Sequence, residues 1–96
     1  MSHVPKEADV QNFSDFLNTT KTADMNKKEE FSKMVDDGLE ILGIPLQEAG
    51  IMFRTAPGTV SRWKNGHTAP PLVSRIAIKT MLTARVRGII RAPGSH

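Results

Sequence analysis

The sequence predicts an all-α fold, a compact bundle of four to five helices preceded by a disordered N-terminal tail. Apolar residues recur with a period near 3.6 over residues 26–42 and 71–91, which is the spacing of a helix face. Proline and glycine stand where such segments begin and end. Two short segments joined by a turn of three or four residues, within 45–65, predict a helix-turn-helix. A chain of 96 residues holds one domain at most.

Residues 1–25 are expected to form a flexible N-terminal tail, because they are polar and rich in threonine. A second interpretation comes from Val10, Phe13, Phe16 and Leu17, which fall at helical spacing. That segment could form a short amphipathic helix that docks on this domain or on a partner. The sequence leaves both interpretations open.

The helix-turn-helix domain is expected over residues 26–91, with its first helix over about 26–42. Asn26 is a suitable N-cap, and Glu29 three residues later completes a pattern like a capping box. Gly43 is well placed to end the helix, because glycine accepts the left-handed backbone of a C-terminal cap.

A second helix is expected over residues 45–53, a turn at 54–56 and a third helix over 57–65. Pro57 suits the first position of the third helix, where its missing N–H has no intrahelical acceptor to lose. Gly50 supplies the small residue that close packing of the two helices requires.

A last, long helix is expected over residues 71–91, followed by a frayed C-terminus at 92–96. Its apolar residues cover more than one stripe and exceed what a small bundle buries. Part of that surface is therefore available for pairing with a second copy of the chain as a homodimer. The arginines of this helix, Arg75 among them, are expected on a solvated face.

The third helix has the pattern of a surface helix that is held by one face. Val60 and Trp63 are three residues apart and share that face, so polar residues occupy the others. A helix that is anchored in this way and polar elsewhere is suited to projection into a DNA groove.

Charge is divided unequally along the chain. Residues 51–96 contain eight Arg and Lys and no Asp or Glu, whereas residues 1–50 contain five Lys against ten Asp and Glu. A basic half favours a polyanion, most simply nucleic acid, because neutralised phosphates release counterions. The alternative is that the acidic half folds back over the basic half and neutralises it.

Residues from about 28 to 90 resemble the Cro and phage-repressor type of helix-turn-helix domain, a lambda-repressor-like fold. The resemblance is carried by residues 60–66, Val-Ser-Arg-Trp-Lys-Asn-Gly, and by Pro70. It implies that Val60 and Trp63 are buried and that their helix enters the major groove of DNA.

The resemblance also implies a base-edge contact for Arg62 and a backbone contact for Asn65. Three positions depart from the family pattern. Arg54 stands where the turn usually has Gly, and Ala56 stands where a Ser or Thr cap usually precedes the third helix. Lys64 stands where Glu is frequent, so any internal ion pair made at this position is expected to be lost.

Pro57 and Gly58 are a further departure, because the family normally projects long polar side chains into the groove from these two positions. Neither residue offers a side-chain hydrogen bond, so fewer side chains are available to read bases. The remaining candidate DNA-binding residues are Arg54, Thr59, Ser61, Arg62, Lys64 and Asn65.

We therefore expect a small transcriptional regulator that binds double-stranded DNA through helix 57–65. The alternative is a helix-turn-helix protein that binds a protein partner instead, such as an antiactivator that inhibits a transcriptional regulator. A weaker third possibility is an antitoxin-like module whose tail wraps a partner. The antiactivator alternative would use the apolar last helix, through Ile78, Met81, Leu82, Val86 and Ile89.

Catalysis has little support, so no enzyme activity, cofactor or metal is expected. The basic half has no carboxylate to orient a histidine, the three His lack metal-ligand spacing, and no phosphate-binding glycine loop is present. The lack of Cys suits a reducing cytoplasm. No apolar run approaches the roughly 20 residues of a membrane-spanning helix, so no membrane contact is expected.

Overall fold

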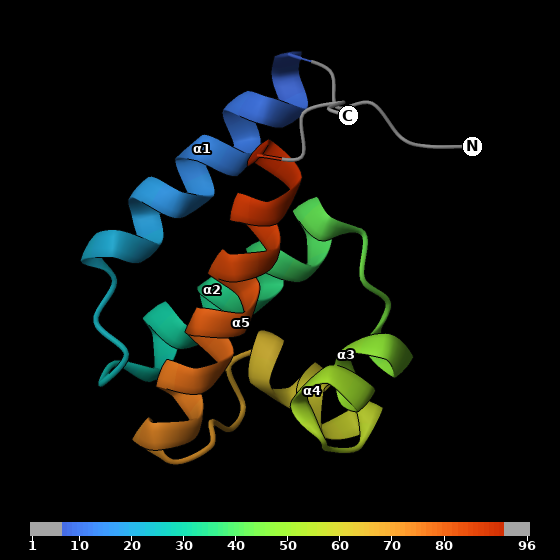
Figure 1. The fold of residues 1–96 in the computed structure, drawn as a ribbon. Coiled ribbons are helices and arrows are strands. Elements are labelled where there is room, and N and C mark those ends of the chain that lie inside the picture. The colour runs from blue at the N-terminus through green and yellow to red at the C-terminus, as the bar shows by residue number, and fades with distance from the viewer. Residues whose placement is uncertain (1–6, 92–96) are drawn as a thin grey trace.

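A computed structural model describes residues 7–91 of the chain, with side chains described over 11–90. These residues form five helices and no strand, which confirms the all-α fold (Figure 1). The helices are α1 Glu7–Thr22, α2 Lys28–Leu42, α3 Leu46–Phe53, α4 Pro57–Lys64 and α5 Leu72–Arg91.

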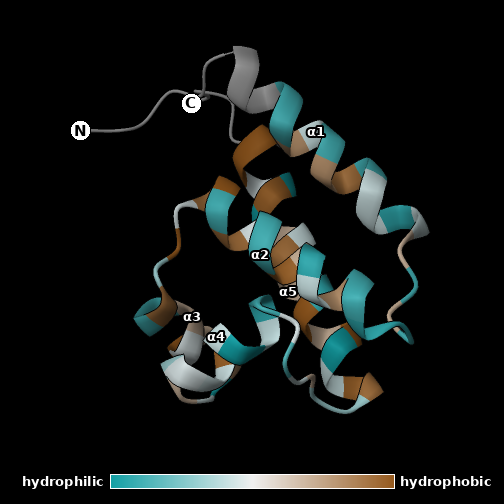
Figure 2. Ribbon diagram, turned by 180° about the vertical axis from the view of Figure 1, so that it is seen from behind, coloured by the Kyte–Doolittle hydropathy of each residue, from teal (hydrophilic) through white to brown (hydrophobic). Residues whose placement is uncertain are grey.

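The core lies where α2 and α5 meet in the middle of the molecule. Helix α1 packs against both of them, and α3 and α4 pack on each other and, through α4, on α2 (Figure 1). The hydropathy colouring shows hydrophobic stretches of α5 behind α2 (Figure 2). The most deeply buried large side chains come from α2, α4 and α5: Phe31, Val35, Val60, Leu82 and Val86.

Helix α1 replaces most of the expected flexible tail. Phe13 and Phe16 on this helix are buried in the core, so the tail prediction is wrong and the docked amphipathic helix is right over the described residues. The close approach depends on Gly38 of α2, where an added Cβ would lie 3.1 Å from both Phe16 Cζ and Leu82 Cδ1. Residues 1–6, the side chain of Val10 and the predicted frayed end at 92–96 lie outside the described part of the chain.

The start of α2 differs from the predicted capping box. Lys27 is the N-cap residue, and no side chain caps the helix there. Instead, the backbone N–H of Asp24 donates to Glu30 Oε1 at 2.8 Å. Asp24 Oδ1 in turn accepts from the backbone and side-chain amides of Asn26, at 2.9 and 3.0 Å. These hydrogen bonds from Asn26 lower the pKa of the Asp24 carboxyl. Gly43 ends α2 in the left-handed conformation, as predicted.

Arg75 is a structural residue, and its assignment to a solvated face was wrong. Its Nε donates to the carbonyl of Pro70 at 2.7 Å, and its Nη1 donates to the carbonyls of Met25 and Asn26 at 3.0 and 3.3 Å. A single guanidinium therefore joins the connection before α2 to the connection before α5, which are far apart in sequence. Charge-assisted hydrogen bonds of this kind are stronger than neutral ones.

Candidate nucleic-acid interface

Helices α3 and α4 form the predicted helix-turn-helix unit, with a turn at residues 54–56. Gly50 allows the chain to turn back this closely, because an added Cβ there would lie 2.7 Å from the carbonyl oxygen of Thr55. The backbone N–H of Thr55 donates to the carbonyl of Gly50 at 2.8 Å and closes the turn. The prediction that close packing of these two helices requires a small residue at Gly50 is confirmed.

Arg54 ends α3 with a φ angle of 57°, in the left-handed region. It is the only residue other than glycine with a positive φ angle among the described residues. A side chain in that conformation costs roughly 1–2 kcal/mol relative to the right-handed one, which is why glycine is common there. The exposed Arg54 side chain therefore occupies a position where the backbone conformation favours glycine.

One face of α4 is fixed in the core. Val60 is fully buried and Trp63 is 7% exposed. The indole of Trp63 makes an edge-to-face contact with Phe31 of α2, at 6.0 Å between ring centroids, and a tilted contact with Phe53 of α3 at 6.4 Å. Contacts on two different helices set both the position and the rotation of α4. The predicted burial of Val60 and Trp63 is confirmed.

The opposite face of α4 is available to solvent. Arg62 and Asn65 are exposed, and Thr59 and Ser61 are half-buried beside them. Asn65 Nδ2 lies 3.4 Å from Ser61 Oγ, at the long limit of a hydrogen bond. Within the described residues, Arg62 and Arg54 are in no ion pair and no side-chain hydrogen bond. Both guanidinium groups therefore keep all their donors free.

Lys64 behaves differently from the sequence-based expectation. Its Nζ lies 3.5 Å from Asp36 Oδ1 of α2, with the two side chains 33% and 49% exposed. The prediction that no internal ion pair forms at this position is wrong. Asp36 of α2 supplies the acidic partner, and Lys64 of α4 is the basic one. This contact reduces the charge that Lys64 offers to a ligand.

The start of α4 carries no polar side chain. Ala56 makes no side-chain cap, and Pro57 and Gly58 are exposed. No atom lies within 4 Å of the position that a Cβ on Gly58 would take, so packing does not require glycine there. Helix geometry leaves the N–H of Gly58 without an acceptor inside the helix.

The acidic half of the chain covers the basic half only in part. Besides the pair made by Lys64, Arg85 Nη1 of α5 lies 4.0 Å from Glu48 Oε2 of α3, and both side chains are about half exposed. Exposed ion pairs of this length contribute little, about 0–1 kcal/mol. Positive charge therefore remains around α4.

The prediction of a protein-binding surface on α5 is wrong for the residues at the centre of this helix. Ile78, Leu82 and Val86 are 3%, 0% and 0% exposed, because α1 and α2 both pack on this helix. Met81 and Ile89 are half-buried. The sequence pattern alone does not distinguish these residues from a free face, because their burial depends on the docking of α1 and α2. The exposed large hydrophobic side chains are Ile51 of α3 and four residues toward the two ends of α5: Leu72, Val73, Ile76 and Ile90.

The described residues offer neither a cluster of metal ligands nor a membrane-spanning helix. No group of three or more His, Cys, Asp and Glu side chains among them could hold a metal ion. None of their helices has the length and the apolar character needed to cross a membrane. No family model, no curated protein and no solved structure matches this chain significantly.

Proposed function

We propose that the protein is a small transcriptional regulator that binds double-stranded DNA with α4 in the major groove. Arg62 reads base edges, because a guanidinium can donate two parallel hydrogen bonds to guanine. Arg54 and Asn65 contact the phosphate backbone on either side. We propose the cytoplasm as its compartment, which suits a chain that contains no Cys.

The orientation of α4 carries this proposal. Its inner face is held by Val60 and Trp63, and its outer face presents an unpaired Arg62. An α-helix with its side chains is about 10–12 Å in diameter, which matches the roughly 12 Å width of the major groove. The positive charge around α4 supplies attraction to phosphates that does not depend on sequence.

Sequence discrimination by one copy is expected to be small. Pro57 and Gly58 leave Arg62 as the main base-reading side chain, and one bidentate contact contributes on the order of 1–3 kcal/mol. Two copies on a two-part site would double that discrimination. We therefore propose that the functional form on DNA is a dimer.

Arg62→Ala tests the proposal directly. A preferred duplex is first selected from random-sequence DNA with the purified protein, and affinities for this duplex and a scrambled one are then measured by fluorescence anisotropy. We expect the variant to lose roughly 5- to 150-fold of the preference for each bound copy, which corresponds to one bidentate contact per copy.

Arg87→Ala is the matched control, since Arg87 is an exposed arginine on α5 and its loss changes the net charge equally. It should keep the preference for the selected duplex. An unaltered preference in Arg62→Ala, or equal losses in both variants, would reject base reading by α4.

Arg54→Gly should separate stability from binding. Glycine relieves the left-handed backbone at this position, so the free energy of unfolding is expected to rise by about 0.5–1 kcal/mol. Loss of a phosphate contact should at the same time weaken binding to all duplexes and reduce the slope of log affinity against log salt by about 1. Chemical denaturation and binding at several salt concentrations measure the two effects. Unchanged binding would identify Arg54 as a solvated turn residue.

A further inference from the structure

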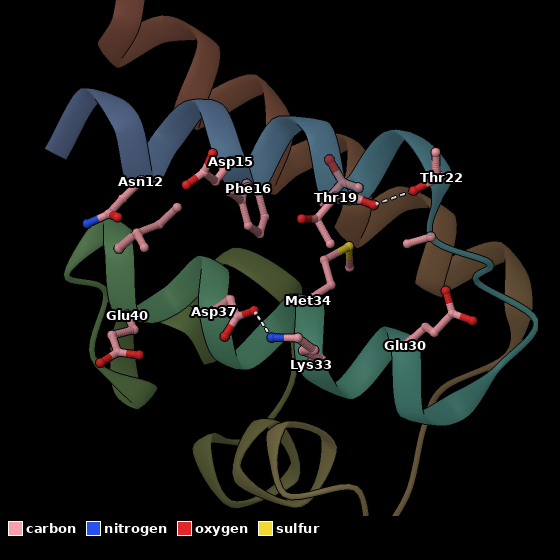
Figure 3. Close-up of a pocket in the computed structure, with 13 residues that line it drawn as sticks. Asn12, Asp15, Phe16, Thr19, Thr22, Glu30, Lys33, Met34, Asp37 and Glu40 are labelled. Atoms are coloured by element: carbon pink, nitrogen blue, oxygen red, sulfur yellow. Dashed lines mark hydrogen bonds and ion pairs between the residues drawn. The ribbon is translucent and has the colours of Figure 1, made fainter. Parts of the chain in front are cut away.

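A groove of about 450 Å³ lies between α1 and α2. Asn12 and Glu40 lie at one end of the groove, and Thr22 and Glu30 lie at the other (Figure 3). The two helices run past each other in opposite directions here. Ten residues of helix separate Asn12 from Thr22, so the groove is about 15 Å long.

The floor of this groove is apolar and its rim is acidic. Phe16 and Met34 point into the space between the helices (Figure 3), and Ala23 and Ile41 complete the floor. Four carboxylates and a single ammonium group lie among the lining residues: Asp15, Glu30, Asp37 and Glu40, and Lys33.

The single cation is already engaged. Lys33 Nζ lies 2.8 Å from Asp37 Oδ2, and this contact raises the pKa of the Lys33 ammonium. Within the described residues, no cation lies within ion-pair distance of Asp15 or Glu40. Glu30 is also paired, because its Oε2 lies 3.7 Å from Lys27 Nζ. The free negative charge of the rim therefore comes from Asp15 on α1 and Glu40 on α2.

The groove is separate from the proposed DNA interface. Helix α2 lies between α1 and α4, and α4 is on the far side of α2 from the groove (Figure 1). Asp36 and Asp37 are consecutive on α2, and the first pairs with α4 while the second lines the groove. A ligand in the groove would therefore leave the exposed face of α4 free for DNA.

From these contacts we infer that the α1–α2 groove binds a basic amphipathic helix of a partner protein. An apolar stripe would pack against Ala23 and Ile41, the half-buried apolar side chains of the floor, and flanking Lys or Arg would meet the free carboxylates Asp15 and Glu40. The length of the groove corresponds to about three helical turns, enough for apolar anchors at i, i+4 and i+7. An acidic segment does not fit the rim, and a purely polar segment does not fit the floor.

Synthetic peptides serve as the probe. The first has about 14 residues of leucine and lysine, with the leucines on one helical face. The second has the same composition in an order that distributes the leucines around the helix. We expect the first peptide to shift the amide resonances of α1 and α2 in the full chain and to bind at least tenfold more tightly than the second.

Variants of the rim then test the site. Asp15→Asn and Glu40→Gln, one on each helix, should each weaken binding about threefold at low salt and about tenfold together. Glu29→Gln is the matched control, because Glu29 is an exposed carboxylate on α2 outside the groove. Thr19→Arg places a cation and extra volume at an exposed lining position and should abolish binding. Circular dichroism verifies that each variant is folded.

Four results would overturn the inference. They are shifts confined to α4 and its turn, equal binding of the two peptides, binding that Thr19→Arg leaves intact, and occupation of the groove by a second copy of the chain. Sedimentation of the free protein with and without Thr19→Arg detects the last of these. None of the four depends on whether the chain binds DNA.

Discussion

Replacing Trp63 with alanine is expected to lower the free energy of unfolding by about 3–5 kcal/mol. The indole is 7% exposed and contacts rings of both α2 and α3, so its removal leaves a cavity at the point that holds α4. A chain of 96 residues has a total stability of roughly 5–14 kcal/mol. The variant should therefore be partly or wholly unfolded near 37 °C, which thermal denaturation followed by circular dichroism measures.

Two comparisons show whether this effect is specific. Trp63→Phe keeps an aromatic ring in the site and should cost clearly less, about 1–3 kcal/mol. Arg62→Ala, at the neighbouring but exposed position, should change stability by no more than about 0.5 kcal/mol. A small loss in Trp63→Ala, of the size found in Arg62→Ala, would contradict the role of the indole as the anchor of α4.

Replacing Gly50 with alanine should destabilise the protein even though alanine is the better helix former. The new methyl group would lie 2.7 Å from the Thr55 carbonyl oxygen, and a backbone atom cannot move aside as a side chain can. Overpacking of this kind costs about 1–3 kcal/mol, more than the roughly 1 kcal/mol that alanine gains over glycine in a helix. We expect the melting temperature to fall by several degrees.

Gly58→Ala is the control for that substitution. Gly58 also lies in a helix, but nothing stands within 4 Å of its Cβ position. Alanine should there stabilise the protein by up to about 1 kcal/mol. The two identical substitutions are thus expected to have opposite signs. If Gly50→Ala were stabilising too, the α3–α4 contact would have to be looser than described.

Much of the fold could be predicted because local signals mark its helices. Pro57 and Gly43 stand at helix ends, and the buried residues of α2 and α4 repeat at helical spacing. The sequence could not predict whether α1 forms, because its few apolar residues fit a tail and a docked helix equally. Its burial depends on Gly38, which is distant in sequence and whose role as a contact point has no local signal.

Only those features of the candidate site that depend on the face of a single helix could be predicted from the sequence. The inward face of α4 and the exposure of Arg62 follow from spacing. The ion pair of Lys64 with Asp36 and the hydrogen bonds of Arg75 to the connection before α2 join segments 28 or more residues apart. Such contacts depend on how the helices pack, which a single sequence does not specify.

The surroundings of Trp63 make it a natural spectroscopic reporter. The chain has one tryptophan and no tyrosine, so its near-ultraviolet emission comes almost entirely from this indole. Because the ring is enclosed by Phe31 and Phe53, a detached α4 would expose it to water and shift the emission to longer wavelength. Docking of the proposed reading helix can therefore be followed in the unlabelled protein, separately from the unfolding of α1.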